Sequence, residues 1–259
     1  MDLNLKDRVA LITGGSKGIG QAIALQLAKE GCNIGICARG ASQLDETIEK
    51  LTLYGIKAHG VIADVTVPSQ VEAFVKECAT VLGGIDYLVG NAGGVLGGSL
   101  LESTPLDWQQ TFELNFFHCV NAIRASVPFM QQRGSGSIVL ISSISAKKAS
   151  PRAQYGCAKA AQIYLAESLA RELAEYKIRV NSLSPGSTYF PGGGWDKFKQ
   201  VNPDWFADFE QRDFPSKRLA TPEEIAEVVA FILSDRANWI NGTDIPVDGA
   251  QLRPSARGY

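Results

Sequence analysis

Short apolar runs and longer amphipathic stretches alternate along the chain. Each run is rich in β-branched and other apolar residues, and most are followed by apolar residues at helical spacing. This alternation is typical of βαβ units, in which parallel strands form one sheet between helices. Strands are predicted over residues 8–13, 32–37, 57–62, 87–90, 137–141, 178–183 and 244–247. Helices are predicted over residues 18–30, 42–54, 106–133 and 155–176, and two more begin at Pro68 and Pro222.

One segment, residues 184–218, departs from this alternation. It holds four prolines, a run of three glycines and a cluster of Trp and Phe residues. A long irregular stretch within a compact domain is usually a lid or a binding loop, although it can also be a surface excursion packed on the fold. We expect a partly helical, mobile substrate lid. Its aromatic side chains suit a hydrophobic or ring-bearing substrate, but they can equally pack against one another.

Composition places the chain among ordinary globular proteins. It has 259 residues, of which 45% are hydrophobic, and a formal net charge of −2. That length and composition suit one domain over residues 1–259, and the small charge gives no sign of nucleic-acid or membrane binding. Five scattered cysteines without CxxC or His-coupled spacing indicate buried free thiols and no metal site. We therefore expect a soluble cytoplasmic protein.

A glycine-rich turn joins the first predicted strand to the first predicted helix. Glycines let the backbone approach a pyrophosphate closely, and the helix N-terminus offers free N–H groups to phosphates. The spacing is G-x-x-x-G-x-G, and its place after the first strand strengthens a signal that is weak alone. The residues expected to bind cofactor here are Gly14, Ser16, Lys17, Gly18, Ile19 and Gly20.

The end of the second strand bears on the choice of cofactor. NAD sites usually carry an acidic residue there for the ribose 2′-hydroxyl. This chain has Arg39 instead, and Lys17 supplies a second cation that can reach a 2′-phosphate. The alternative is two ordinary solvated cations, but the exchange of acid for cations favours NADP(H) over NAD(H). Asp64, after the third strand, can accept a hydrogen bond from adenine or simply cap the next turn.

Tyr155 and Lys159 form a Tyr-x-x-x-Lys pair near the start of a predicted helix. Residues four apart lie on one helical face, so the ammonium can lie beside the phenol. A nearby cation favours the phenolate and lowers a tyrosine pKa that is ordinarily about 10. We expect Tyr155 to exchange a proton with a substrate oxygen as general acid and base.

Two further polar positions are candidates for the reacting site. Ser142 and Ser143 follow the fifth strand, where ligands of α/β sheets bind, and a hydroxyl there can polarise a substrate oxygen. A serine pair at such a place can also be turn chemistry. Asn115 lies among apolar residues of a predicted helix, so it needs buried partners and is able to hold a water.

Taken together, these motifs resemble the short-chain dehydrogenase/reductase family, of the single-domain, 3-oxoacyl-carrier-protein reductase-like type. The resemblance runs from Val9 to about Gly249, and many enzymes that act on other ketones and sugars look equally similar. Its motifs are Thr13-Gly14…Gly18-Ile19-Gly20, Asp64, Asn91-Ala92-Gly93, Asn115, Ser143, Tyr155, Lys159, Ser184-Pro185-Gly186 and Asn241-Gly242-Thr243.

The resemblance implies a role for each matching position. Asn115, Ser143, Tyr155 and Lys159 would form a catalytic tetrad, with Asn115 holding a water of a proton relay. Tyr155 and Lys159 would also bind cofactor, and Thr188 would bond its carboxamide or pyrophosphate. The remaining cofactor positions are Val65, Asn91, Ala92, Gly93, Pro185 and Gly186. The interval from Ser143 to Tyr155 is one residue shorter than the family pattern, which leaves Ser142 as a substitute, although Ser143 aligns better with the strand end.

The combined prediction is a doubly wound Rossmann fold with seven parallel strands in the order 3-2-1-4-5-6-7. The function expected is NADP(H)-dependent interconversion of a ketone and a secondary alcohol, free or carrier-bound. The resemblance also implies a homotetramer or homodimer. A non-catalytic NADP(H) sensor and a lyase- or epimerase-like reaction without net cofactor turnover are the alternatives.

Overall fold

The computed structural model describes residues 1–252, and within them seven strands form one parallel sheet in the order β3-β2-β1-β4-β5-β6-β7. This order confirms the predicted doubly wound topology, whose two halves meet between β1 and β4. The strands are β1 (Val9–Thr13), β2 (Asn33–Ala38), β3 (Ala58–Ile62), β4 (Tyr87–Gly90), β5 (Gly136–Ile141), β6 (Ile178–Pro185) and β7 (Asp244–Val247).

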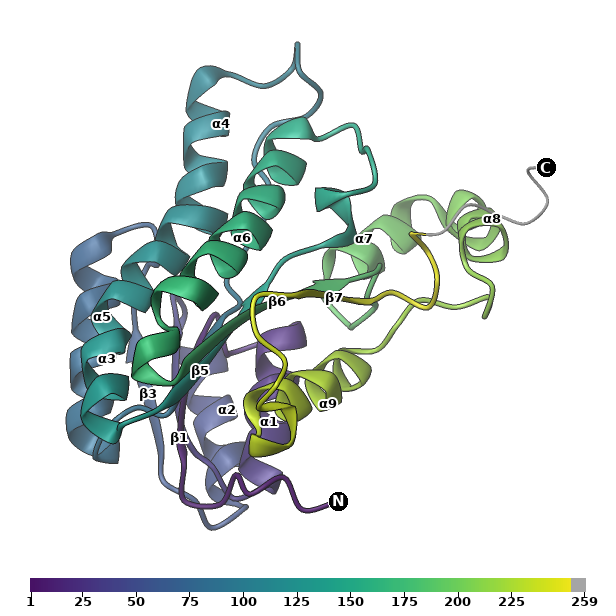
Figure 1. Ribbon diagram of the computed structural model, residues 1–259. Helices are drawn as coiled ribbons and strands as arrows, with labels where there is room; N and C mark the ends of the chain where they lie inside the picture. Colours follow the sequence, from purple (N-terminus) through teal and green to yellow (C-terminus); the bar gives the residue numbers. More distant parts are fainter. Residues whose placement is uncertain (253–259) are drawn as a thin grey trace.

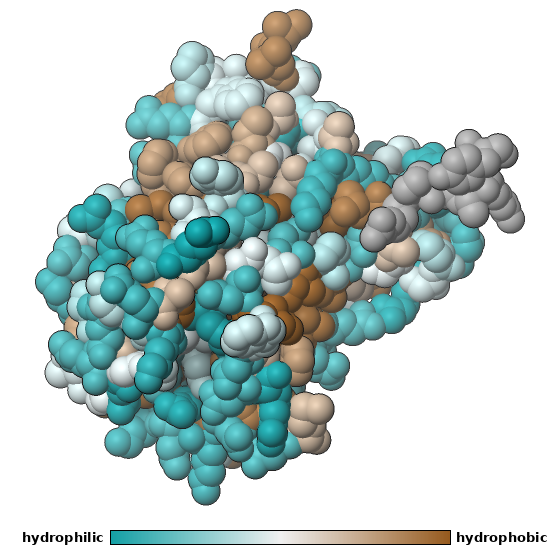
Figure 2. All heavy atoms as spheres, in the orientation of Figure 1, coloured by the Kyte–Doolittle hydropathy of each residue, from teal (hydrophilic) through white to brown (hydrophobic). Residues whose placement is uncertain are grey.

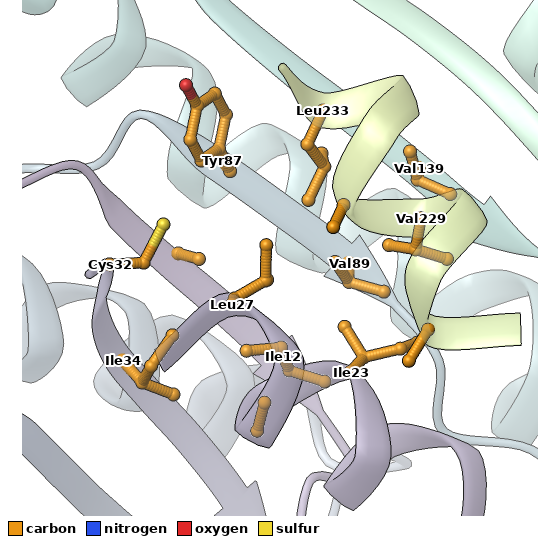
Figure 3. Packing of buried hydrophobic residues seen from close by; sticks show 14 of the residues in the cluster. Ile12, Ile23, Leu27, Cys32, Ile34, Tyr87, Val89, Val139, Val229 and Leu233 are labelled. Atoms are coloured by element: carbon orange, nitrogen blue, oxygen red, sulfur yellow. The ribbon is translucent and has the colours of Figure 1, made fainter. Parts of the chain in front are cut away.

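Helices cover both faces of the sheet. The helices of the dinucleotide-fold framework are α1 (Gly18–Lys29), α2 (Ala41–Thr52), α3 (Pro68–Leu82), α5 (His118–Arg133), α6 (Ala153–Glu172) and α9 (Pro222–Leu233). Side chains alternate along β1 because strand residues point to opposite faces. Ala10 and Ile12 belong to the core under α1 and α9, part of which Figure 3 shows, whereas Val9 and Leu11 belong to the core under α3 and α5.

The helix predicted over residues 106–133 is interrupted. It consists of α4 (Pro105–Phe112), a π-helical turn η1 (Glu113–Phe117) and α5. The π turn surrounds Asn115, whose Nδ2 donates to the Thr111 carbonyl at 2.7 Å and so takes up a backbone acceptor inside the helix. Apolar spacing cannot reveal such an inserted residue, because the flanking helices keep their own periodicity.

Residues 184–218 contain two helices, α7 (Gly194–Val201) and α8 (Pro203–Asp213), which stand out from the sheet at one end (Figure 1). Their aromatic side chains pack against one another. The Trp195 and Phe209 rings stack at 4.7 Å, and Phe206 and Phe209 are buried. Of the two interpretations of these aromatics, internal packing is the one the structure shows for this cluster.

All five cysteines are free, as their spacing predicted. Cys32, Cys37, Cys78 and Cys119 are buried, whereas Cys157 is exposed on α6, contrary to the expectation of burial. None of the helices described within residues 1–252 is long and apolar enough to cross a membrane. In the same part of the chain, no three His, Cys, Asp or Glu side chains are grouped to hold a metal ion.

Candidate active site

The predicted site residues gather at the carboxyl ends of the strands. The glycine turn follows β1, Arg39 follows β2, Asp64 and Val65 follow β3, and Asn91-Ala92-Gly93 follow β4. Ser143 follows β5, Pro185 and Gly186 lie at the end of β6, and α6 brings in Tyr155 and Lys159. Parallel strands place all their carboxyl ends at one edge, so residues from seven separate segments share one site.

The glycine turn is packed too tightly for side chains. A Cβ atom on Gly20 would lie 2.3 Å from the Gly14 carbonyl oxygen and 2.4 Å from Asn91 Nδ2. Asn91 Nδ2 donates to the carbonyls of Thr13 and Gly14 at 2.9 and 3.2 Å, so the loop after β4 holds the turn in place. No side chain of the described residues caps the N-terminus of α1 at Lys17. Its backbone N–H groups therefore suit a phosphate, which supports a dinucleotide in this cradle.

Arg39 and Lys17 are both exposed, with Arg39 directly after β2. Arg39 is close enough to Asp64 to help lower the pKa of that carboxyl, but the larger cause is hydrogen bonding from the backbone and side chain of Thr66. Asp64 Oδ1 accepts both bonds, at 2.9 and 2.7 Å. Of the two interpretations of Asp64, the turn cap is the one that these two hydrogen bonds show.

The two serines after β5 point in different directions. Ser142 is buried and its hydroxyl donates to the Lys159 carbonyl at 2.9 Å, so it fastens α6 to the sheet. Ser143 accepts a hydrogen bond from the Ser145 N–H at 3.1 Å and also hydrogen-bonds to Tyr155. Successive residues of an extended chain face opposite sides, which explains the divergence. Of the two serines, Ser143 is therefore the one whose hydroxyl lies beside Tyr155.

Burial dominates the electrostatics of Tyr155 and Lys159. Contrary to the expectation that the neighbouring cation lowers it, the pKa of the Tyr155 phenol is raised by burial, and the hydrogen bond from Ser143 opposes this. Burial also lowers the pKa of Lys159 to about 8, and its Nζ lies 5.5 Å from the centre of the Tyr155 ring. Lys159 Nζ donates to the Ile141 carbonyl at 2.8 Å, which fixes the ammonium beside β5. A half-buried acid beside a buried cation, both with shifted pKa values, is typical of a catalytic site.

Asn115 clamps the loop after β4 to the π turn. Its Nδ2 donates to the Gly94 carbonyl at 2.6 Å, and its Oδ1 accepts from the Gly94 N–H at 3.2 Å. A Cβ atom on Gly93 would lie 2.8 Å from Asn115 Oδ1 and 3.3 Å from Lys159 Nζ. Asn115 and Lys159 therefore flank the same glycine, as two members of one site should.

Several contacts around this site are not apparent in the sequence. Phe190, from residues 184–218, lies over the glycine turn, since a Cβ atom on Gly18 would come within 2.6 Å of its ring. Lys147 pairs with Asp244 at 2.7 Å and Lys148 with Asp213 at 3.1 Å, which ties the loop after β5 to β7 and to α8. Thr188 donates its hydroxyl to the Gly186 carbonyl at 3.1 Å and bridges to Ala220. Apart from the local bond between Thr188 and Gly186, these contacts join distant segments, so no local pattern signals them.

Known proteins resemble the chain over nearly its whole length. Residues 14–250 match the model of a family described as enoyl-(acyl carrier protein) reductase. Isoepoxydon dehydrogenase of Aspergillus clavatus is 33% identical over 95% of both chains. The 3-oxoacyl-[acyl-carrier-protein] reductase of Staphylococcus epidermidis is 33% identical over 94% of this chain and 98% of its own. The structure of L-sorbose reductase from Gluconobacter frateurii, complexed with NADPH and L-sorbose, has a TM-score of 0.93 at 35% identity and covers 98% of this chain and 100% of its own.

Proposed function

Because the chain belongs to the short-chain dehydrogenase/reductase family of oxidoreductases, we propose that it interconverts a ketone and a secondary alcohol with NADP(H). The observation that carries this proposal is the convergence of Ser143, Tyr155 and Lys159 beside the phosphate turn. The family relationship supplies the reaction class, and the arrangement of the site supplies the roles.

Each residue of the site has a distinct task. NADPH, when bound, supplies the hydride for the carbonyl carbon. Ser143 holds the carbonyl oxygen by hydrogen bonding, and Tyr155 donates the proton that this oxygen needs as charge develops on it. In the reverse direction Tyr155 takes the proton from the alcohol. Lys159 contributes positive charge beside the phenol and a donor for the nicotinamide ribose. Asn115 bonds directly to Gly94 and so keeps the π turn against the loop after β4, in place of the water-holding role expected from the resemblance.

The cradle for the cofactor comes from the strand ends. Gly14, Ser16, Lys17, Gly18, Ile19 and Gly20 surround the pyrophosphate, and Arg39 with Lys17 takes the 2′-phosphate. Asp64 and Val65 border the adenine. Asn91, Ala92 and Gly93 line the ribose side, and Pro185, Gly186 and Thr188 border the nicotinamide. Residues 184–218 form the lid, and its contact through Phe190 with Gly18 supports coupling between lid and cofactor.

A substrate panel tests the proposed reaction. The named relatives act on, or are complexed with, chemically different molecules, so the panel should span L-sorbose and other keto-sugars, cyclic ketones and 3-oxoacyl thioesters. Oxidation of NADPH, followed by absorbance, is expected with at least one class. Tight NADPH binding without turnover of any ketone or alcohol would favour the sensor, and substrate conversion without net cofactor change would favour a lyase or epimerase.

The pH dependence of the reduction rate should follow the titration of the Lys159 ammonium. Its pKa is lowered to about 8, so the ammonium is present at neutral pH and is lost as the pH rises through that value. The parameter kcat/KM for NADPH reports the free enzyme, so it should be level near pH 7 and fall roughly tenfold per unit above about 8. The raised pKa of Tyr155 keeps the phenol protonated throughout this range.

The Lys159→Arg variant provides the control for this profile, because a guanidinium stays protonated in proteins. Its activity is expected to be lower, with the fall in kcat/KM moved to higher pH. A break that stayed near pH 8 in this variant would assign the titration to another group.

The homotetramer or homodimer expected for the family is also a proposal. Exposed aromatic side chains support it, since Tyr164 on α6 is 73% exposed and Phe117 on η1 is 43% exposed. Figure 2 shows apolar and weakly polar side chains gathered over α6 in that view. Light scattering of the purified protein should give a mass at least twice 27.8 kDa, and a monomeric mass would contradict the proposal.

A further inference from the structure

His118 is a fully buried polar side chain that the proposed chemistry does not use. It begins α5, three residues after Asn115, and its Nε2 lies 3.2 Å from Thr13 Oγ1 at the end of β1. The carbonyl of Leu114, in the π turn, hydrogen-bonds to the same imidazole. Burial, helped by the charge of Lys159, lowers the pKa of His118 to about 3, so the ring is neutral at physiological pH.

The hydrogen bonds of Thr13 determine which imidazole nitrogen carries the proton. Thr13 Oγ1 accepts from the N–H groups of Asn91 and Ala92 at 2.9 and 3.1 Å. A hydroxyl has two acceptor sites and one hydrogen, so the hydrogen is left to donate. His118 Nε2, at 3.2 Å, is nearer than the Val89 carbonyl, at 3.5 Å. Nε2 therefore accepts, and the proton of the neutral ring lies on Nδ1.

This arrangement gives the loop after β4 two attachments to one helical turn. Asn115 bonds directly to Gly94, while His118 reaches Asn91 and Ala92 through the Thr13 hydroxyl. The first attachment borders Lys159, and the second borders the glycine turn. Two separated attachments fix the orientation of a segment, whereas one leaves it free to pivot.

Gln162 provides a third attachment, between the same π turn and α6. It is fully buried one turn after Lys159, and its Nε2 donates to the Asn115 carbonyl at 2.9 Å and to Cys119 Sγ at 3.2 Å. The sulfur in turn lies 3.4 Å from His118 Nε2. The buried polar side chains of His118, Cys119 and Gln162 are thus contiguous behind the reacting groups.

We propose that His118 is a positioning residue. It aligns the glycine turn and the loop after β4 with the π turn that carries Asn115. Gln162 extends this alignment to α6, the helix of Tyr155 and Lys159. Its catalytic consequence rests on the proposed function. A misplacement of about 1 Å can cost on the order of 100-fold in rate, so kcat should fall. Cofactor affinity should change less, because Asn91 Nδ2 still holds the glycine turn through the Thr13 and Gly14 carbonyls.

Three substitutions at His118 separate its hydrogen bonds from its packing. His118→Gln keeps an acceptor at the position of Nε2, His118→Asn keeps only a donor toward Leu114, and His118→Leu keeps neither. We expect kcat for reduction to fall at least about tenfold in His118→Leu and His118→Asn, with partial rescue in His118→Gln and a KM for NADPH within about threefold of wild type. Gln162→Met, nearly isosteric, should lower kcat in the same way by removing the bond to the Asn115 carbonyl.

Ser126→Ala is the matched control, because Ser126 is buried on α5 with no hydrogen-bond partner for its hydroxyl among residues 1–252. It should leave kcat unchanged. If all three His118 variants had the same kcat, and differed from one another only in thermal stability, the proposal would be overturned.

Amide hydrogen exchange keeps this test independent of the enzymatic proposal. The N–H groups of Asn91 and Ala92 should exchange faster in His118→Leu than in wild type or Ser126→Ala, whatever reaction the protein catalyses. Unchanged exchange there would overturn the positioning role, whereas full turnover in Tyr155→Phe would remove the catalytic proposal alone.

Discussion

The Tyr155→Phe variant is expected to lose about 100- to 10,000-fold in kcat while it binds NADPH as tightly as the wild-type protein. The substitution removes the phenolic proton and retains the ring that packs beneath Lys159. General acid catalysis at the substrate oxygen is then lost, but the glycine turn and the cations near the 2′-phosphate remain. Turnover is measured by NADPH absorbance and binding by the fluorescence of the bound nicotinamide.

Tyr164→Phe gives a matched control on the same helix. Tyr164 is largely exposed and lies nine residues after Tyr155 on α6, more than two helical turns away, so its hydroxyl should contribute nothing to kcat. Wild-type turnover in Tyr155→Phe would remove Tyr155 from the acid/base role. Loss of NADPH binding in that variant would instead indicate a structural defect, which the melting temperature would reveal.

The Arg39→Asp variant is expected to reverse cofactor preference toward NADH. A charge-assisted hydrogen bond contributes about 1.5–3 kcal/mol, so kcat/KM with NADPH should fall roughly 10- to 100-fold. The introduced carboxylate also repels the 2′-phosphate and can accept a hydrogen bond from the 2′-hydroxyl of NADH. The measurement is the ratio of kcat/KM values for NADPH and NADH in both proteins.

Arg171→Asp makes the same charge change at an exposed position on α6 and should leave that ratio unaltered. Lys17→Ala should lower kcat/KM for NADPH by a smaller factor than Arg39→Asp, because the lysine adds charge without a bidentate geometry. A ratio in Arg39→Asp equal to that of wild type would contradict the assignment of Arg39 to the 2′-phosphate.

The location of the site was predictable because it depends on order along the chain. Alternating strands and helices predict parallel strands, and parallel strands bring residues such as Arg39, Asn91 and Ser143 to one edge without any knowledge of packing. The proximity of Tyr155 and Lys159 could be predicted without the strand order, since one helix carries both residues. Local periodicity and strand order therefore account for most of the candidate site.

The orientation of individual side chains was not predictable in this way. Ser142 and Ser143 are adjacent and chemically alike, and only their tertiary contacts distinguish them: Ser142 bonds to the Lys159 carbonyl, whereas Ser143 bonds to Tyr155. The π turn at Asn115 inserts one residue into a helix whose flanks look regular. His118 meets Thr13 across 105 positions of sequence, so neither residue carries a local sign of its partner.

By itself, the sequence determined the fold class, the strand order through its family resemblance, and the residue types available for proton transfer and phosphate binding. These follow from periodicity and motif order, which are properties of neighbouring residues. Tertiary structure alone decided that the aromatic side chains of residues 184–218 pack on one another, that Lys147 and Lys148 anchor the loop after β5, and that buried His118 faces Thr13. The physical reason is that each of these contacts joins segments far apart in the chain, where burial and hydrogen-bond geometry, and not local pattern, select the partner.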